Sequence, residues 1–162
     1  MPGLRKYNIL SEQYVTEWLA MKYPVGTWQT NVQLGELDTS QYFVQPTDSE
    51  IAATKPWLPE CDALVILPDE VHIIEAKIRD DRGKVEQLLL YGFLFKRTQR
   101  FRQHWNKPVK LILLTPMQQG NLEKWLNSLG ITVAYYTPAW LLDYLGKLPK
   151  RQLRAAGSAI KL

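Results

Sequence analysis

The sequence predicts an α/β domain in which helices flank a mixed β-sheet. Helical and strand-like patterns alternate along the chain, and the first and last of these patterns are amphipathic helices. Several strand-like segments are short and almost entirely apolar, which is typical of strands buried within a layered domain. With 162 residues, of which 46% are apolar and 22% are charged, the chain is long enough to bury one core.

The first element expected is a helix over residues 11–23. Its apolar residues recur at helical spacing, Ser11 is a suitable N-cap residue, and Pro24 cannot continue the helix. Residues 28–37 alternate between apolar and polar side chains, as strands with one solvated face do. The chain therefore begins with a helix followed by a strand.

A loop and a β-hairpin are expected next. Residues 38–59 are rich in Asp, Ser, Thr and Pro, which predicts a long loop with one short strand over 42–45. Residues 63–67 form an apolar run, Pro68 begins a turn, and residues 71–77 return as a second apolar strand. The two apolar runs are therefore predicted to pair in antiparallel fashion.

The second half of the chain alternates helices with strands. Residues 84–105 are expected to form a long helix, and the continuous apolar run over 109–115 predicts a buried strand. A helix over 121–129, closed by a glycine, precedes a strand over 131–137. Residues 138–145 complete the pattern as a helix with proline in its first turn. Helices and strands in this order favour a mixed sheet covered on both faces.

Three charged residues lie within or at the ends of the hairpin strands: Asp62, Glu75 and Lys77. Side chains alternate along a strand, so Glu75 and Lys77 point to one face, close to where Asp62 begins the partner strand. Buried charge is costly unless it is paired or bound to a metal. We therefore interpret the three residues as a site, in which two carboxylates and the carbonyl of Ala76 suit Mg²⁺, with Mn²⁺ as a substitute.

The order of these residues resembles the motif of the PD-(D/E)xK nuclease superfamily, in which an acid is followed, across a hairpin, by acid-x-lysine. Here the motif is Asp62 and then Glu75-Ala76-Lys77. The downstream segment Gln87-Leu-Leu-Leu-Tyr91 resembles the Gln-x-x-x-Tyr signature of the RecB-like and λ-exonuclease-like branches. On a helix, Gln87 and Tyr91 share one face.

The resemblance implies a restriction-endonuclease-like αβββαβ core over residues 1–146, followed by a basic tail over 147–162. It also implies a Mg²⁺-dependent deoxyribonuclease that hydrolyses phosphodiester bonds, of a kind found in viral or mobile-element DNA processing, recombination and repair. Such enzymes bind the metal through residues like Asp62, Glu75 and Ala76. The superfamily often adds a glutamate from the first helix, here Glu12 or Glu17; Glu12 fits the helical spacing better.

The remaining motif residues are expected to assist the reaction. Lys77 would position the attacking water or neutralise charge on the phosphate, and Gln87 and Tyr91 would hold the DNA strand or the lysine. The sequence also departs from the family pattern, because no Pro-Asp dipeptide precedes the hairpin and the first helix lacks the histidine of RecB-like members.

The chain has a net charge of +4, and many of its basic residues lie in two clusters along the sequence. Clusters of this kind suit binding to a polyanion. Residues 96–110 contain no acid, nor does the chain from Lys147 onward. We expect DNA as the partner. The residues expected to contact it are Lys84, Lys96, Arg97, Arg100 and Arg102, with Lys107, Lys110, Lys150, Arg151, Arg154 and Lys161 as further members of the two clusters.

Other features limit the alternatives. Cys61 is the only cysteine, which excludes an internal disulfide and a four-cysteine iron–sulfur cluster; we expect a buried thiol. His72 lies opposite the Glu75 face and is expected in the core. No segment resembles a signal peptide or a membrane span, so the expected compartment is the cytoplasm, or the host cytoplasm for a viral protein.

Two other functions are compatible with the same residues. One is a non-catalytic DNA-binding or assembly module that keeps the nuclease fold. The other is cleavage of RNA. Partner proteins that direct cleavage are compatible with a nuclease of this length.

Overall fold

The computed structural model describes residues 2–36, 47–50, 58–78 and 84–147. Within these ranges a five-stranded mixed sheet is flanked by helices, as the sequence predicted. The helices and strands, in chain order, are α1 (Pro2–Lys22), β1 (Trp28–Gln33), β2 (Glu60–Ile66), β3 (Val71–Ala76), α3 (Lys84–Phe95), η2 (Gln99–His104), β4 (Val109–Thr115), α4 (Asn121–Ser128), β5 (Ile131–Tyr135) and α5 (Ala139–Gly146).

The strands lie in the sheet in the order in which they occur in the chain, from β1 to β5. β1, β2 and β3 are antiparallel neighbours, whereas β3, β4 and β5 run parallel. Parallel neighbours need a crossover connection, which α3 supplies between β3 and β4 and α4 supplies between β4 and β5. β3 is central, and all six of its residues are buried.

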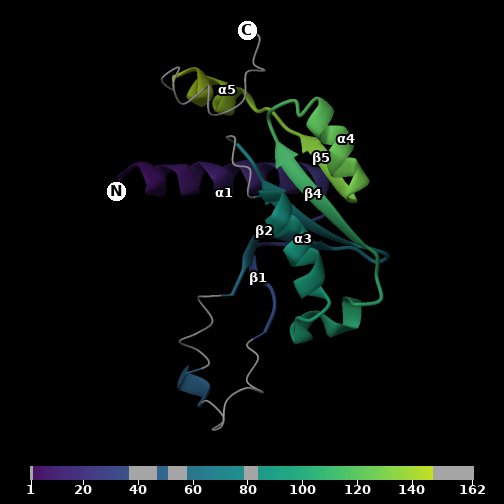
Figure 1. Ribbon diagram of the computed structural model, residues 1–162. Helices are drawn as coiled ribbons and strands as arrows, with labels where there is room; N and C mark the ends of the chain where they lie inside the picture. The colour runs from purple at the N-terminus through teal and green to yellow at the C-terminus, as the bar shows by residue number, and fades with distance from the viewer. Residues whose placement is uncertain (1, 37–46, 51–57, 79–83, 148–162) are drawn as a thin grey trace.

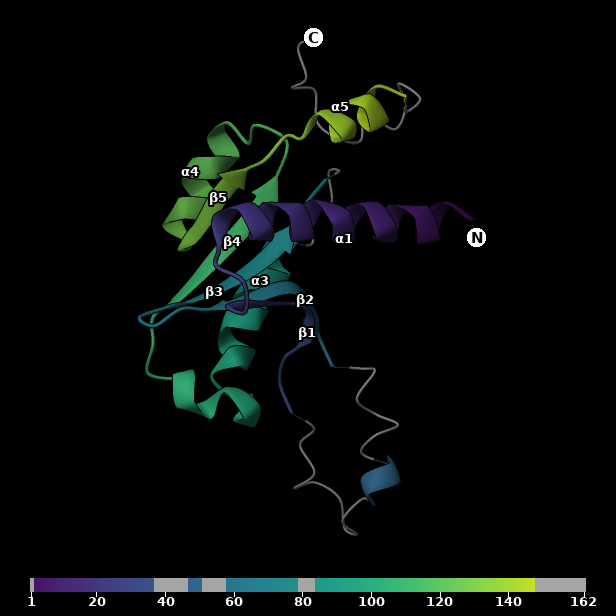
Figure 2. The same ribbon diagram turned by 180° about the vertical axis from the view of Figure 1, so that it is seen from behind.

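Helices cover both faces of the sheet. Figure 1 shows α3 in front of the sheet and α1 behind it, and Figure 2 shows the reverse view with α1 in front. Buried residues of α1 and α5 pack against one face, and those of α3 and α4 pack against the other. The molecule therefore has three layers, with the hairpin strands between α1 and α3.

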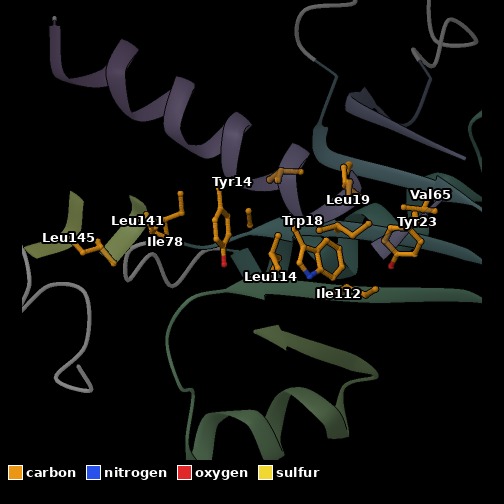
Figure 3. Close-up of a cluster of buried hydrophobic side chains, with 14 residues drawn as sticks. Tyr14, Trp18, Leu19, Tyr23, Val65, Ile78, Ile112, Leu114, Leu141 and Leu145 are labelled. Atoms are coloured by element: carbon orange, nitrogen blue, oxygen red, sulfur yellow. The ribbon is translucent and has the colours of Figure 1, made fainter. Parts of the chain in front are cut away.

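The α1 side of the core is rich in aromatic residues (Figure 3). Tyr14 is fully buried, stacks on Tyr136 and donates a 2.7 Å hydrogen bond to the carbonyl oxygen of that residue. Trp18 lies further along the same helix and packs edge to face on Tyr23, the residue that follows its end. Each such side chain contributes roughly 1.5–3 kcal/mol through burial, so this face of α1 holds the helix firmly on the sheet.

The predicted burial of His72 and of Cys61 is confirmed. His72 is buried, shares a 2.8 Å hydrogen bond with the hydroxyl of Tyr23 through Nδ1, and contacts Glu70 at 2.7 Å through Nε2. Cys61 is fully buried, and burial raises the pKa of its thiol well above the ordinary value. Both residues belong to the packing of the sheet.

The helix boundaries differ from the sequence prediction in two places. α1 begins at Pro2, so Ser11 lies inside the helix and not at its N-cap. The long helix expected over 84–105 is two helices, α3 and the 3₁₀-helix η2. Thr98 lies at the break, where its hydroxyl donates to the Leu94 carbonyl and accepts from the N–H of Gly35, which anchors the turn to the chain after β1.

Strand lengths differ slightly as well. β1 ends at Gln33 and β5 at Tyr135, a few residues before the expected ends. The strand expected over 42–45 and most of the basic tail lie outside the described residues. No helix in the described part of the chain combines the length and apolar character needed to cross a membrane.

Candidate active site

The hairpin places the two predicted carboxylates opposite each other. β2 and β3 pair Ala63 with Ile74, and continuation of this register brings Asp62 opposite Glu75. The backbone N–H of Asp62 donates a 3.4 Å hydrogen bond to Oε2 of Glu75, and the N–H of Ala76 donates a 2.7 Å hydrogen bond to Oδ2 of Asp62. Each carboxylate is thus held by the backbone of the other strand.

Burial makes these carboxylates unusual acids. The side chain of Glu75 is only 2% exposed. Burial, together with the nearby charge of Asp62, raises the pKa of Glu75 to about 7. Burial also raises the pKa of Asp62, although its hydrogen bond from Ala76 acts in the opposite direction. Two negative charges at this place are therefore unfavourable without a compensating cation.

Lys84 supplies such a cation. It is the first residue of α3, and its ammonium group forms an ion pair and hydrogen bond with Oε1 of Glu75. The positive charge lowers the pKa of both Glu75 and Asp62 and so opposes the effect of burial. Lys84 was expected to contact DNA, and in the structure it belongs to the carboxylate site.

A polar cavity of about 390 Å³ adjoins Asp62. Asn31, which lines the cavity with Asp62, has a left-handed backbone with φ of 53°, a conformation that asparagine tolerates better than most residues. The described residues that line the cavity come from α1, β1, β2 and α3: Ser11, Glu12, Val15, Thr30, Asn31, Glu60, Asp62 and Lys84.

The two candidate glutamates of α1 have different surroundings. Glu12 lines the cavity together with Asp62. Glu17 accepts hydrogen bonds from Nε1 of Trp140 at 2.7 Å and from the hydroxyl of Tyr136 at 3.2 Å. These bonds, with one from Gln13, lower the pKa of Glu17. Glu17 therefore links α1 to the segment around α5, and Glu12 is the helix acid placed toward the site.

Lys77 follows Glu75 on the same face of the hairpin but is deeply buried, with 7% of its surface exposed. Its backbone N–H continues the parallel ladder with a 2.7 Å bond to the carbonyl of Leu114. It is not among the described residues of the cavity wall. Lys84, rather than Lys77, is thus the lysine that reaches both Glu75 and the cavity.

Gln87 and Tyr91 have different environments on α3. The side chain of Tyr91 is buried, and its hydroxyl donates a 2.7 Å hydrogen bond to the carbonyl of Glu60. Burial, and then the charge of Glu75, raises the pKa of Tyr91, so the hydroxyl stays protonated as a donor. This bond fixes α3 to β2 two residues before Asp62. Gln87 is exposed, one turn after Lys84.

The basic cluster lies away from the carboxylates. Val71, at the other end of β3 from Glu75, pairs with Val109, so Lys110 lies near the opposite end of the strands. There Lys110 forms a 2.6 Å ion pair with Glu70. The Nζ of Lys107 donates to the carbonyl of Leu67, in the turn of the hairpin.

The other cluster residues follow the C-terminal end of α3. α3 contains 12 residues, so Lys96 lies about 18 Å along the helix axis from Lys84. Arg97 lies 3.5 Å above the ring of Phe93, and Arg100 donates a 2.6 Å hydrogen bond to the carbonyl of Gln33. Lys96 and Arg102 are exposed. A substrate that touches both the cavity and this cluster must therefore extend along α3.

The structure adds residues that the sequence prediction missed. Glu60 lies two positions before Asp62, so strand alternation alone places it on the same side. Thr30 and Asn31 come from β1, and Ser11 comes from α1. No local pattern identifies these three, because their proximity to Asp62 depends on how β1 and α1 pack onto the hairpin.

Comparison with known proteins identifies no relative of this chain. No protein-family model, no curated protein sequence and no solved structure matches this chain. Within residues 2–36, 47–50, 58–78 and 84–147, no group of three His, Cys, Asp or Glu side chains is arranged to hold a metal ion. Asp62 and Glu75 are the carboxylates held together across the hairpin, and Glu12 lines the cavity beside Asp62.

Proposed function

We propose that this protein is a divalent-metal-dependent DNA nuclease with a restriction-endonuclease-like core. The observation that carries the proposal is the pair of buried carboxylates, Asp62 and Glu75, on adjacent antiparallel strands beside a polar cavity. The order of α1, β1, β2, β3, α3 and β4 is that of the αβββαβ core implied by the sequence motif. Buried carboxylates with raised pKa values beside a cavity are typical of functional sites, which supports this proposal.

The two carboxylates fit a hard divalent cation. Mg²⁺ is commonly held by only one or two carboxylates, with water and substrate phosphate completing its coordination. Carboxylate oxygens from Asp62 and Glu75 are of this type, and a divalent cation would relieve the repulsion that raises the pKa of Glu75. We assign two further oxygen donors to the same site, the Ala76 carbonyl and Glu12, which lines the cavity with Asp62.

The surrounding residues have distinct roles in this proposal. A bound divalent cation would polarise the phosphate and lower the pKa of a water. Asp62 and Glu75 hold that cation, and the N–H of Ala76 orients Asp62. Lys84 brings positive charge to the cavity wall, where it opposes the negative charge of the phosphate. We assign Lys77 to positioning the attacking water or neutralising phosphate charge, and the exposed Gln87 to holding the DNA strand. Tyr91 supports the site from behind, because its hydroxyl holds β2 through the Glu60 carbonyl.

The basic residues after α3 extend the binding surface for DNA. Lys96, Arg97, Arg100 and Arg102 follow α3 away from the carboxylates, and phosphate contacts of this kind are independent of sequence. A duplex rises about 3.4 Å per base pair along each strand, so the length of α3 corresponds to roughly five base pairs. Cleavage near Lys84 and backbone contact near Arg97 can therefore involve the same DNA segment.

Cleavage of defined nucleic acids tests the proposal. The purified protein is incubated with linear duplex, closed circular, single-stranded DNA and RNA, each with Mg²⁺, Mn²⁺, Ca²⁺ or EDTA. We expect DNA cleavage with Mg²⁺ or Mn²⁺, little turnover with Ca²⁺, and none with EDTA. Cutting of closed circles identifies an endonuclease, and degradation restricted to linear DNA identifies an exonuclease.

The same assay separates the rival functions. DNA binding without cleavage in every metal would contradict the proposal and support the non-catalytic module. Cleavage confined to RNA would contradict the choice of substrate. Full activity in EDTA would contradict the metal site. The variant Asp62→Asn is the negative control, and Asp69→Asn, which changes an exposed acid in the turn of the same hairpin, is its matched control.

A further inference from the structure

We propose that Lys84 is a built-in counter-cation of the site: its ammonium group takes the place of a divalent metal beside Glu75, and metal binding displaces it into the cavity. This inference rests on the proposed function, because it concerns the same two carboxylates. It assigns Lys84 a role in metal binding in addition to contact with the substrate.

The position of Lys84 is suited to such an exchange. Its ammonium group pairs with Oε1 of Glu75, whose side chain is 2% exposed, while the side chain of Lys84 is 26% exposed. One end of Lys84 thus reaches a buried carboxylate and the rest lies in the wall of an open cavity. The ammonium group can leave Glu75 by rotation of its own side chain, without movement of α3 or of the hairpin.

The charges around the cavity favour a cation at this place. The described residues of the cavity wall include three acids, Glu12, Glu60 and Asp62, and Lys84 is the only base among them. Behind this wall lies Glu75, with its charge buried. Removal of the Lys84 charge would leave buried carboxylates facing each other, which is unfavourable when no other cation takes its place.

Both carboxylate oxygens of Glu75 already have partners, since Lys84 pairs with Oε1 and the N–H of Asp62 donates to Oε2, and a divalent cation close to the ammonium group would repel it. Metal binding therefore has to expel Lys84 from the carboxylate. The expelled group remains tethered to the start of α3, beside the cavity in which the phosphate is proposed to lie. The exchange predicts an order in which metal binding precedes tight binding of DNA.

Lys84→Met is the main test, since it removes the charge and keeps an unbranched side chain. Lys84→Arg keeps the charge, and Lys124→Met is a matched control at an exposed lysine of α4. Binding of Mn²⁺ and Ca²⁺ is measured by titration calorimetry without DNA at pH 8, and melting temperatures are measured in EDTA and in Mn²⁺. For Lys84→Met we expect at least about tenfold tighter metal binding, corresponding to about 1.4 kcal/mol of removed competition.

The melting temperatures provide a second readout. In EDTA, Lys84→Met should melt below the wild-type protein, and saturating Mn²⁺ should abolish most of that difference, because the metal then supplies the missing charge. Lys84→Arg should retain the wild-type melting temperature in EDTA. Lys124→Met should leave both the metal affinity and the response to Mn²⁺ unchanged.

The outcomes distinguish this inference from the proposed function. If the wild-type protein binds metal and cleaves DNA but Lys84→Met binds Mn²⁺ no more tightly, the exchange is refuted and the nuclease proposal stands. If the wild-type protein neither binds metal nor cleaves, both are refuted. Failure of Lys84→Met and Lys84→Gln to fold even with Mn²⁺ would also refute the exchange, because a counter-cation is dispensable once the metal is bound.

Discussion

The backbone N–H of Ala76 donates a 2.7 Å hydrogen bond to Oδ2 of Asp62, so the carboxylate at the start of β2 is held by the strand that carries Glu75. This bond fixes the distance between the two acids of the hairpin through the sheet itself. Each carboxylate is positioned by a backbone N–H group of the partner strand and not by a flexible side chain. A site built on paired strands in this way is preorganised, and its behaviour can be tested by single substitutions.

Asp62→Asn should abolish DNA cleavage while the protein remains folded. The asparagine carbonyl can still accept the N–H of Ala76, but the charge that binds the metal is lost. Metal polarisation contributes several kcal/mol, so we expect a decrease in the cleavage rate of more than about 100-fold. Circular dichroism and the melting temperature check the fold, and Asp69→Asn should cleave like the wild-type protein.

Lys77→Met should lower cleavage strongly with a small effect on stability. The side chain is buried, so methionine is preferable to alanine because it leaves no large cavity. The rate is measured in single-turnover experiments at saturating DNA and metal. Cleavage at the wild-type rate would show that Lys84, the lysine in the cavity wall, is sufficient and that Lys77 is a packing residue.

The stability of the metal-free protein should depend on the protonation of Glu75. The pKa of Glu75 is raised from an ordinary 4.5 to about 7 in the folded protein. Between these two values the folded protein keeps a proton that the unfolded chain releases, so stability falls as the pH rises from about 4.5 to about 7. Burial of Asp62 acts in the same direction.

Glu75→Gln isolates this effect. Urea unfolding in EDTA at several pH values should show a decline on the order of 3 kcal/mol across this window for the wild-type protein and a flatter profile for Glu75→Gln. Glu86→Gln, which changes an exposed acid on α3, should follow the wild-type profile. Parallel profiles for wild type and Glu75→Gln would mean that Glu75 is ionised throughout.

Tyr91→Phe should cost about 1 kcal/mol of stability because it removes the 2.7 Å hydrogen bond to the Glu60 carbonyl and keeps the ring packing. It should also lower the cleavage rate, since that bond holds β2 next to Asp62. Gln87→Ala changes an exposed side chain, so it should lower cleavage without changing the melting temperature. Wild-type cleavage by both variants would show that Gln87 and Tyr91 take no part in the reaction.

Substitution of Arg97 and Arg100 by glutamate should weaken DNA binding equally for all sequences. Each lost phosphate contact lowers the slope of log affinity against log salt by about one. Arg100 also bonds the Gln33 carbonyl, so the melting temperature is measured alongside binding. Lys124→Glu, on α4, is compared with each single arginine variant, because each of these substitutions changes the net charge by the same amount. Unchanged affinity and slope would mean that this cluster only faces solvent.

The local sequence patterns were sufficient to predict the class of the fold. The apolar runs of the hairpin and of β4 predicted buried strands, and their positions are confirmed to within a few residues. Strand periodicity also placed Glu75 beside Asp62, because the register of a hairpin with a short turn leaves few alternatives. The helical spacing of apolar residues over 11–23 predicted a helix with one apolar face, and Tyr14 and Trp18 lie buried on that face.

Only the tertiary structure could reveal the rest of the site. Lys84 meets Glu75 because α3 packs across the sheet, and Asn31 and Glu12 reach the cavity because β1 and α1 lie on the hairpin. The break after α3 depends on Thr98 and Gly35, which are 63 positions apart. Local periodicity specifies which face of an element is apolar, but contacts between elements depend on packing, and the burial that raises the pKa of Glu75 exists only once the layers have assembled.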